Sequence, residues 1–236
     1  MFSSNDRLII LDADGTIIDA FNAIDQTFST HGMALGDLER FQKRHHLFKY
    51  LGGIKEFPSN LKKQLGTQSR KKLLSTLTDV YRDQAKLYPG VADLIHTLVA
   101  EPGIRVGLVT RNITHEPEQT LRKLLARHGI DLDALDFMTH VPLGQEKTGA
   151  FKAARSRFGI NPARSFVCGD EHKDFKSAMA AGMHAFMVSY GFEDYTRLTR
   201  KFQVPEEVIS RTPEELCARV RHALDLQTRL PGNSRN

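Results

Sequence analysis

Residues 8–16 are Leu8-Ile9-Ile10-Leu11-Asp12-Ala13-Asp14-Gly15-Thr16, four apolar residues followed by a turn that carries two carboxylates. A short, continuous apolar run is typical of a parallel strand that is buried on both faces. In an open parallel sheet, ligands bind beyond the carboxyl ends of the strands. The segment therefore predicts that Asp12 and Asp14 leave the first strand at the edge of the sheet where chemistry is expected.

Further along the chain, similar apolar runs alternate with helical patterns. The strands expected from these runs are Val106–Val109, Phe137–Met138, Ser165–Cys168 and Ala185–Val188, with an edge strand at Val208–Ser210. The helices expected around them are Val91–Leu98, Glu118–Ala126, Gly149–Phe158, Lys173–Ala181 and Glu214–Leu226. Strands that alternate with helices predict right-handed βαβ units, and hence an α/β fold with a Rossmann-like, doubly wound parallel sheet.

One interval breaks this alternation. No buried strand is evident from Ile17 to Tyr88, where the sequence shows helical stretches at Ala20–Thr30 and Arg70–Tyr81. An interval of this length is far too long for an ordinary crossover between two strands. We therefore predict a core domain made of residues 1–16 and 89–236, interrupted by a helical cap domain at residues 17–88.

The composition is that of a globular protein without a membrane span. The chain has 236 residues, of which 40% are hydrophobic and 26% are charged. No stretch approaches the roughly 20 apolar residues that cross a bilayer, and the polar start from Met1 to Arg7 does not resemble a secretory signal. Cys168 and Cys217 alone form neither a zinc site nor a disulfide framework. We expect a cytoplasmic protein with no membrane partner.

The positive charge is concentrated in one stretch. The net charge is +5, but Phe41–Lys72 alone holds nine Lys and Arg residues against one acid, Glu56, so the rest of the chain is about −3. A solvated helical face is one explanation. The other is that Arg44, Lys49 or Lys55 contacts an anionic substrate, since basic residues near a cleft concentrate phosphate esters.

The two carboxylates after the first strand point to a metal ion. Asp12 and Asp14 are two residues apart, and close carboxylates repel each other unless a cation or a shared proton intervenes. Mg²⁺ prefers oxygen ligands and substrate phosphates. Gly15 allows a tight turn and a close approach of the backbone to a ligand. Taken alone, the pattern is also compatible with an Asp-Gly turn after a strand.

Four motifs in order link the chain to a known family. Residues 12–16 resemble the Asp-x-Asp-Gly-Thr signature of the haloacid dehalogenase (HAD) superfamily. Val109-Thr110 resembles its hydroxyl motif, Lys147 its lysine, and Gly169-Asp170-Glu171-His172-Lys173-Asp174 its acidic motif. The resemblance covers nearly the whole chain, and the long insertion after the first strand is similar to the capped, phosphoglycolate phosphatase-like subgroup.

This resemblance implies a division of roles at the site. Asp12 is expected to be the nucleophile that forms an aspartyl-phosphate, and Asp14 the general acid and base. Thr110 and Lys147 are expected to hold the phosphate oxygens. We also expect substrate contacts from Arg111 and Asn112 and, because of the local positive charge of the insertion, from Lys49 and Lys55.

The implied cofactor is Mg²⁺, with Asp12, Asp14, Asp170 and Asp174 as its ligand set. Asp14 is expected to contribute its backbone carbonyl, and Asp174 to bind through water or to orient Lys147. One departure affects the lysine, because capped members often have proline after it, whereas Thr148-Gly149 follow here. Lys152 is therefore an alternative for its role.

The resulting expectation is a magnesium-dependent phosphatase that acts on a small phosphorylated metabolite, with phosphoglycolate as one candidate. A sugar phosphomutase and phosphonoacetaldehyde hydrolase are alternatives within the superfamily. Asp14 argues against dehalogenation, which does not need a second aspartate. The remaining alternative is a metabolite- or nucleic-acid-binding protein, and Phe41, Phe48 and Tyr50 do interleave with the basic stretch. Nucleic acid is disfavoured, and the choice between monomer and homodimer stays open.

Overall fold

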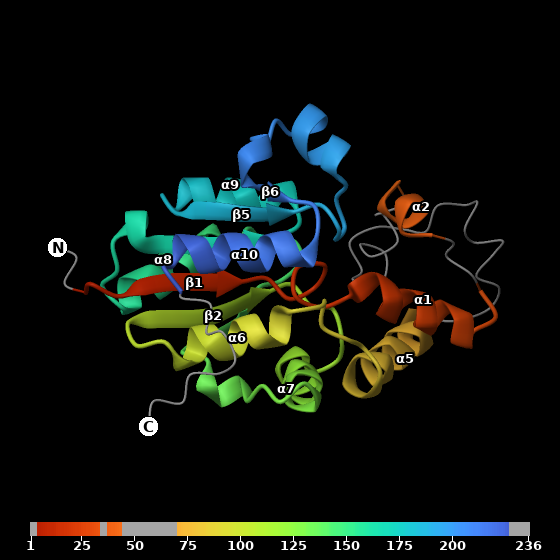
Figure 1. Ribbon diagram of the computed structural model, residues 1–236. Coiled ribbons are helices and arrows are strands. Elements are labelled where there is room, and N and C mark those ends of the chain that lie inside the picture. The colour runs from red at the N-terminus through yellow and green to blue at the C-terminus, as the bar shows by residue number, and fades with distance from the viewer. Residues whose placement is uncertain (1–3, 34–36, 44–69, 227–236) are drawn as a thin grey trace, which may run out of the picture.

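The computed structural model describes residues 4–33, 37–43 and 70–226. Its centre is a six-stranded sheet in the order β3-β2-β1-β4-β5-β6, and every neighbouring pair of strands is parallel (Figure 1). The strands are β1 Arg7–Leu11, β2 Ile104–Thr110, β3 Phe137–His140, β4 Ser165–Gly169, β5 His184–Val188 and β6 Ile209–Ser210. The predicted α/β class and the predicted strands are confirmed, including the short edge strand.

Helices cover both faces of the sheet. One core joins the sheet to α6 (Val91–Ala100), α7 (Pro117–Arg127) and α10 (Pro213–Ala223), and a second joins it to α8 (Thr148–Arg157) and α9 (His172–Ala180). Along β1, Ile9 and Leu11 face the first core while Leu8 and Ile10 face the second. This alternation explains the unbroken apolar run, because both faces of the strand are buried.

The helices that the structure describes within residues 17–88 lie beyond the carboxyl ends of the strands (Figure 1). They are α1 (Ala20–Thr30), α2 (Leu38–Lys43) and α5 (Arg70–Asp83). The predicted helices at Ala20–Thr30 and Arg70–Tyr81 are confirmed, and α2 was not predicted. The division into core and cap stays a prediction. Arg44, Lys49 and Lys55 lie outside the described residues.

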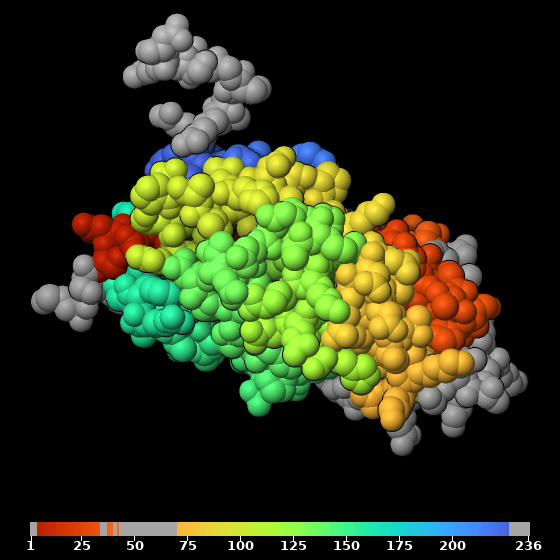
Figure 2. All heavy atoms as spheres, turned by 90° about the horizontal axis from the view of Figure 1, so that it is seen from below, coloured from red at the N-terminus to blue at the C-terminus, as the bar shows by residue number. Residues whose placement is uncertain are grey.

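Helix α5 is fastened to the core through α7 and the turn before it. Arg82 Nε donates to Thr120 Oγ1 at 3.0 Å, and the backbone amide of His115 donates to Thr78 Oγ1 at 2.9 Å. Figure 2 shows the surface of α5 running directly into that of α7. Residues of α5 therefore have a fixed position relative to the ends of the strands.

Elsewhere, the structure adds short elements to the predicted ones. The last helix ends at Ala223 instead of Leu226, since Asp225 adopts a positive φ of 48°. Short helical segments not predicted from the sequence are Leu132–Ala134, Pro162–Arg164, Arg197–Lys201 and Glu206–Val208. None of the helices in the described part of the chain combines the length and the apolar character needed to cross a bilayer.

Candidate active site

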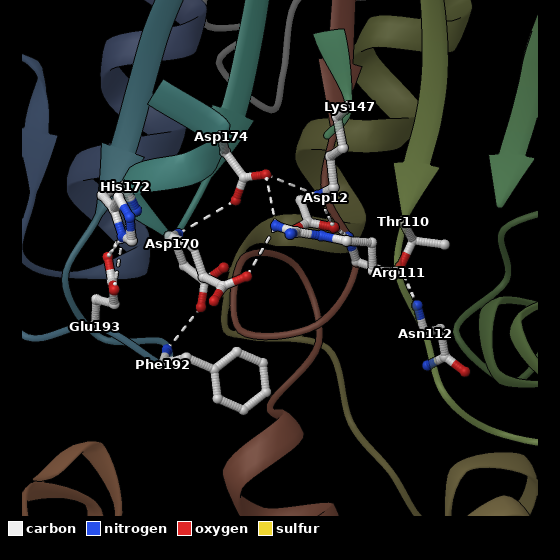
Figure 3. A network of polar contacts seen from close by, with 12 residues as sticks. Asp12, Thr110, Arg111, Asn112, Lys147, Asp170, His172, Asp174, Phe192 and Glu193 are labelled. Carbon is white, nitrogen blue, oxygen red and sulfur yellow. Dashed lines mark hydrogen bonds and ion pairs between the residues drawn. The ribbon is translucent and has the colours of Figure 1, made fainter. Parts of the chain in front are cut away.

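The chemistry-bearing residues gather where the strand order reverses. β1 lies between β2 and β4, so Asp12 after β1, Thr110 at the end of β2 and Asp170 after β4 share one edge of the sheet (Figure 3). The backbone amide of Asp12 donates to the carbonyl of Cys168 at 3.0 Å, which extends the pairing of β1 with β4 to the site itself. The topology thus brings together residues that are far apart in sequence.

Lys147 reaches this edge from the start of α8. Its Nζ lies 2.8 Å from Asp12 Oδ1 and 3.0 Å from Asp174 Oδ1, and its side chain is only 1% exposed. Burial lowers the pKa of Lys147, but Asp12 and Asp174 outweigh it, so this pKa is raised and the ammonium stays charged. Lys152 is exposed on α8. Of the two lysines considered, Lys147 is therefore the one at the site.

Three carboxylates form a group that could hold a metal ion. Ligand oxygens of Asp12, Asp170 and Asp174 all lie within 4.8 Å of one another. Asp170 Oδ2 accepts a 2.6 Å bond from the backbone amide of Phe192, whereas the buried Asp170 Oδ1 has no hydrogen-bond partner among the described residues. A buried oxygen without a donor suits a cation, and an all-carboxylate set suits Mg²⁺.

The pKa values of these carboxyl groups reflect burial and mutual repulsion. Burial and the neighbouring Asp12 raise the pKa of Asp170 well above its usual range. Burial raises the pKa of Asp12 to about 7, although Lys147 partly offsets the effect. Burial also acts on Asp174, but Lys147 and Arg111 outweigh it and lower its pKa. Without a cation, the group therefore retains protons near neutral pH.

Arg111 extends from the end of β2 towards the acidic group (Figure 3). Its Nη2 donates to Glu171 Oε2 at 2.8 Å and to Asp174 Oδ1 at 3.3 Å. Asp174 Oδ2 also accepts the backbone amide of Glu171 at 3.2 Å. The structure thus places Arg111, an expected substrate contact, on acidic side chains, and surrounds Asp174 with donors that include Lys147.

Asp14 lies apart from the acidic group and has partners of its own. Its Oδ1 accepts from the hydroxyl of Tyr81 at 2.8 Å, and Asn112 Nδ2 lies 3.1 and 3.0 Å from its two oxygens. Burial raises the pKa of Asp14 to about 6, and the bonds from Tyr81 and Asn112 oppose that rise. The expectation that Asp14 binds metal concerned its backbone carbonyl and stays a prediction.

The amide of Asn112 is held in one orientation. Its Oδ1 accepts from both the backbone amide and the hydroxyl of Thr114, which leaves Nδ2 facing Asp14. The backbone amide of Asn112 donates to Thr110 Oγ1 at 3.1 Å. That bond uses a lone pair of the Thr110 hydroxyl, so its hydrogen can still be donated to a phosphate oxygen. Asn112 is thereby committed to Asp14, whereas Thr110 can still donate.

Two glycines let the backbone pass directly against Asp170. Gly15 has a φ of +79°, and a Cβ there would lie 2.2 Å from Asp170 Oδ2. A Cβ on Gly191 would lie 2.4 Å from the same oxygen. Gly15 was expected to allow a close approach, whereas Gly191 had not been singled out. Any larger residue at either position would displace the carboxylate.

Sequence reasoning missed several residues that support the site. Tyr81 was predicted only as part of a helix, and Thr114 and Phe192 not at all. Glu193 also belongs here, because its carboxylate accepts from the backbone amide of His172 at 2.6 Å and lies 2.9 Å from His172 Nδ1. The closeness of Thr114 to Asn112 was an available signal, whereas the backbone donor of Phe192 leaves no trace in residue type.

Comparisons with known proteins agree with this architecture. A family model described as haloacid dehalogenase-like hydrolase matches residues 9–188. The phosphoglycolate phosphatase of Aliivibrio fischeri is 25% identical over 200 residues, and that of Nitrosococcus oceani is 28% identical over 206. Both alignments cover 79% of this chain and 85% of the relative.

A solved structure supports the fold over almost the full length. The haloacid dehalogenase-like family protein of Streptococcus pneumoniae superposes with a TM-score of 0.57 at 18% identity, covering 91% of this chain and 98% of that one. At this identity, the likeness concerns the fold alone. Taken with the family match over most of the chain, the comparisons confirm the resemblance noted in the sequence: the chain belongs to the haloacid dehalogenase-like hydrolase family and is, as predicted, a phosphoric monoester hydrolase.

Proposed function

We propose that this enzyme is a Mg²⁺-dependent phosphatase that hydrolyses a small phosphate monoester through an aspartyl-phosphate on Asp12. The observation that carries the proposal is the buried contact between Lys147 Nζ and Asp12 Oδ1. It places a permanent positive charge beside the carboxylate that must approach a phosphate dianion. Without that charge, two anions would have to meet in a buried site.

Asp12 is oriented for attack by contacts on one oxygen. Oδ1 accepts the backbone amide of Ala13 at 2.8 Å and faces Lys147, whereas no described residue donates to Oδ2. We assign the attack on phosphorus to Oδ2. A phosphorus–oxygen bond then forms to Asp12 while the bond to the ester oxygen breaks, which divides hydrolysis into two easier displacements.

Asp14 is the proposed acid and then the base. A pKa of about 6 allows its carboxyl group to protonate the departing ester oxygen in the first step. The resulting carboxylate accepts a proton from the water that attacks the aspartyl-phosphate in the second. Tyr81 and Asn112 hold Asp14 in place during both steps, since three of their bonds converge on its oxygens.

The phosphoryl oxygens need positive partners during transfer. Lys147 and the hydroxyl of Thr110 are the proposed protein donors. Asp12, Asp170 and Asp174, with the backbone carbonyl of Asp14, would hold Mg²⁺, which when bound neutralises charge on the phosphoryl group. Asp174 serves at least as much to hold Lys147, whose Nζ lies 3.0 Å from it.

Phosphoglycolate is the substrate we favour within this class. The support is that the two relatives above bear the name phosphoglycolate phosphatase and align with 79% of this chain. Phosphoglycolate carries a carboxylate beside its phosphate, and this second anionic group suits a basic insertion, so Lys49 and Lys55 stay predicted contacts for it. Other small phosphate monoesters stay candidate substrates and are tested beside phosphoglycolate.

The test combines a substrate panel with trapping of the intermediate. Purified enzyme is assayed for phosphate release from phosphorylated metabolites with Mg²⁺ and with EDTA. In a second assay, the reaction with radiolabelled substrate is quenched in acid to trap phosphorylated protein. We expect Mg²⁺-dependent turnover and a protein-bound phosphate that hydroxylamine removes, as an acyl phosphate requires. Asp12→Asn should lack both. Turnover in EDTA, or labelling that persists in Asp12→Asn, would refute the mechanism.

The same experiment separates a phosphatase from a sugar phosphomutase. A phosphatase releases inorganic phosphate in proportion to the substrate consumed. A mutase returns the phosphoryl group to another hydroxyl of the sugar and releases little phosphate. Isomer formation without phosphate release would therefore replace the proposed function by the mutase alternative.

A further inference from the structure

A single peptide unit links the insertion to the acidic group. The backbone amide of Phe192 donates to Asp170 Oδ2 at 2.6 Å. The carbonyl of Gly191, at the other end of the same peptide bond, accepts from Gln42 Nε2 at 2.7 Å. Gln42 lies on α2, 149 residues earlier in the chain, and is only 6% exposed. The side chain and the carboxylate are thus connected through one planar group.

The two bonds act on each other through geometry and polarisation. Because the peptide is planar, its N–H cannot turn away from Asp170 without turning its carbonyl away from Gln42. A carbonyl that accepts a hydrogen bond also makes the N–H of the same peptide a stronger donor. Gln42 Nε2 lies 3.3 Å from the Ser189 carbonyl as well, so it reaches this loop at two points.

There is little slack for the peptide to shift. A Cβ on Gly191 would lie 2.4 Å from both Asp170 Oδ2 and the Gly15 carbonyl oxygen, so the backbone is already in close contact with the carboxylate. A rotation of the peptide would therefore be passed on to Asp170. Because Oδ2 is held by Phe192, the orientation of Oδ1, which has no partner among the described residues, follows the peptide.

We propose that Gln42 is a positioning residue for the metal site, which orients Asp170 through the Gly191–Phe192 peptide. The inference rests on the proposed function in that Asp170 is taken as a ligand of Mg²⁺. It gives α2 a role in positioning a metal ligand. Neither the charge nor the residue types of the insertion indicate this role. Because the two are linked, Mg²⁺ binding should stabilise the packing of α2 against the core, and that packing should in turn strengthen Mg²⁺ binding.

Core contacts hold the flanks of this loop independently of Gln42. The Tyr190 hydroxyl donates to the Thr16 carbonyl at 3.1 Å, and Glu193 Oε2 accepts the backbone amide of His172 at 2.6 Å. Loss of the Gln42 amide should therefore misorient the peptide without detaching the loop. This difference separates a positioning role from a merely structural one.

The test measures Mg²⁺ binding in the absence of substrate. Gln42→Met keeps the size and removes the donor, and Gln42→Glu replaces the donor by a carboxylate that repels both carbonyls. Gln119→Met, at an exposed position on α7, is the control. Residues that orient metal ligands typically affect affinity ten- to a hundredfold, and Gln42 acts one step further out, so we expect about three- to tenfold weaker binding in Gln42→Met. Gln42→Glu should bind at least as weakly.

Two further measurements keep the result interpretable. In EDTA, the Gln42→Met melting temperature should fall below that of the control only by the few degrees that the loss of a buried hydrogen bond costs, while the Phe192 amide exchanges its hydrogen faster than in wild type. Two results overturn the positioning role of Gln42 but leave the proposed phosphatase function intact. The first is a Mg²⁺ affinity within twofold of wild type in both Gln42 variants, and the second is weaker Mg²⁺ binding in Gln42→Met but not in Gln42→Glu. If wild-type protein bound no Mg²⁺, both the proposed metal dependence and the positioning role of Gln42 would be overturned.

Discussion

The Tyr81 hydroxyl donates a 2.8 Å hydrogen bond to Asp14 Oδ1 across 67 residues of sequence. Tyr81 belongs to α5, in the long interval after β1, whereas Asp14 belongs to the turn that leaves β1. Burial and the neighbouring Asp14 raise the pKa of Tyr81 well above its usual range, so the hydroxyl remains a donor. A helix of the insertion is thus connected directly to the proposed acid and base.

Tyr81→Phe should shift the pH dependence of the reaction. Burial raises the pKa of Asp14 to about 6, and the Tyr81 bond opposes this because it stabilises the carboxylate. Removing the bond should therefore raise the pKa of Asp14 further. One hydrogen bond of about 1 kcal/mol corresponds to roughly 0.7 pH unit. Protonated Asp14 is needed to start the reaction, so the alkaline limb of kcat/KM should move to higher pH by about that amount.

The matched control is Tyr88→Phe, which removes a hydroxyl whose bond, to the Tyr190 carbonyl at 3.5 Å, does not involve Asp14. Its pH profile should overlay that of the wild type. An unshifted profile in Tyr81→Phe, with kcat/KM otherwise normal, would show that Tyr81 does not act on Asp14.

Asp14→Asn should slow both chemical steps without removing the nucleophile. General acid and base groups typically contribute ~10² to 10⁴ in rate, and kcat should fall by that factor. A substrate with a good leaving group, such as p-nitrophenyl phosphate, needs little help in the first step. In rapid-quench experiments with it, Asp14→Asn should therefore accumulate the phosphorylated protein. Loss of labelling together with turnover would instead indicate that Asp14 is needed to bind substrate or metal.

The strands, and the order in which the motifs follow them along the chain, could be predicted from the sequence because each signal is local. The Leu8–Leu11 run is apolar throughout, since β1 is buried on both faces. Asp12, Thr110 and Asp170 then fall at strand ends, and a parallel sheet brings such ends to one edge. Lys147 reaches Asp12 although its following residues depart from the family pattern.

The partners of individual side chains could not be predicted in the same way. An arginine beside a phosphate-binding motif has the same residue type whether it faces substrate or, as Arg111 does, Glu171 and Asp174. The bond from Tyr81 depends on how α5 is seated against the core, which local sequence does not encode. The Phe192 amide contributes through its backbone, so its residue type carries no signal.

Arg111→Met tests whether Arg111 mainly offsets the acidic side chains. Arg111 is 8% exposed, and its removal leaves Asp174 with Lys147 and deprives Glu171 of this partner. Breaking a buried ion pair costs several kcal/mol, and because Lys147 remains we expect about 3 kcal/mol at most. For a chain of this size, that lowers the melting temperature in EDTA by roughly 5–10 °C.

Arg122→Met is the control, since Arg122 forms an exposed pair with Asp133 that should contribute little. Mg²⁺ should restore part of the loss in Arg111→Met because a cation offsets the same carboxylates. Unchanged stability with a large rise in KM would return Arg111 to the role of a substrate contact.

Mg²⁺ binding should release protons near neutral pH. Burial raises the pKa of Asp12 from its ordinary value of 3.8 to about 7, and burial and the neighbouring Asp12 also raise the pKa of Asp170. The stability that a protonated Asp12 contributes is fully present below about pH 4 and is lost as the pH rises through about 7. The melting temperature in EDTA should therefore fall between pH 5 and pH 8, and Mg²⁺ should raise it most at pH 8.

Calorimetry at pH 6 in buffers of different ionisation enthalpy measures the released protons directly. Asp12→Asn should release fewer than wild type, whereas binding without proton release at that pH would mean that the carboxylates are already ionised in the free protein.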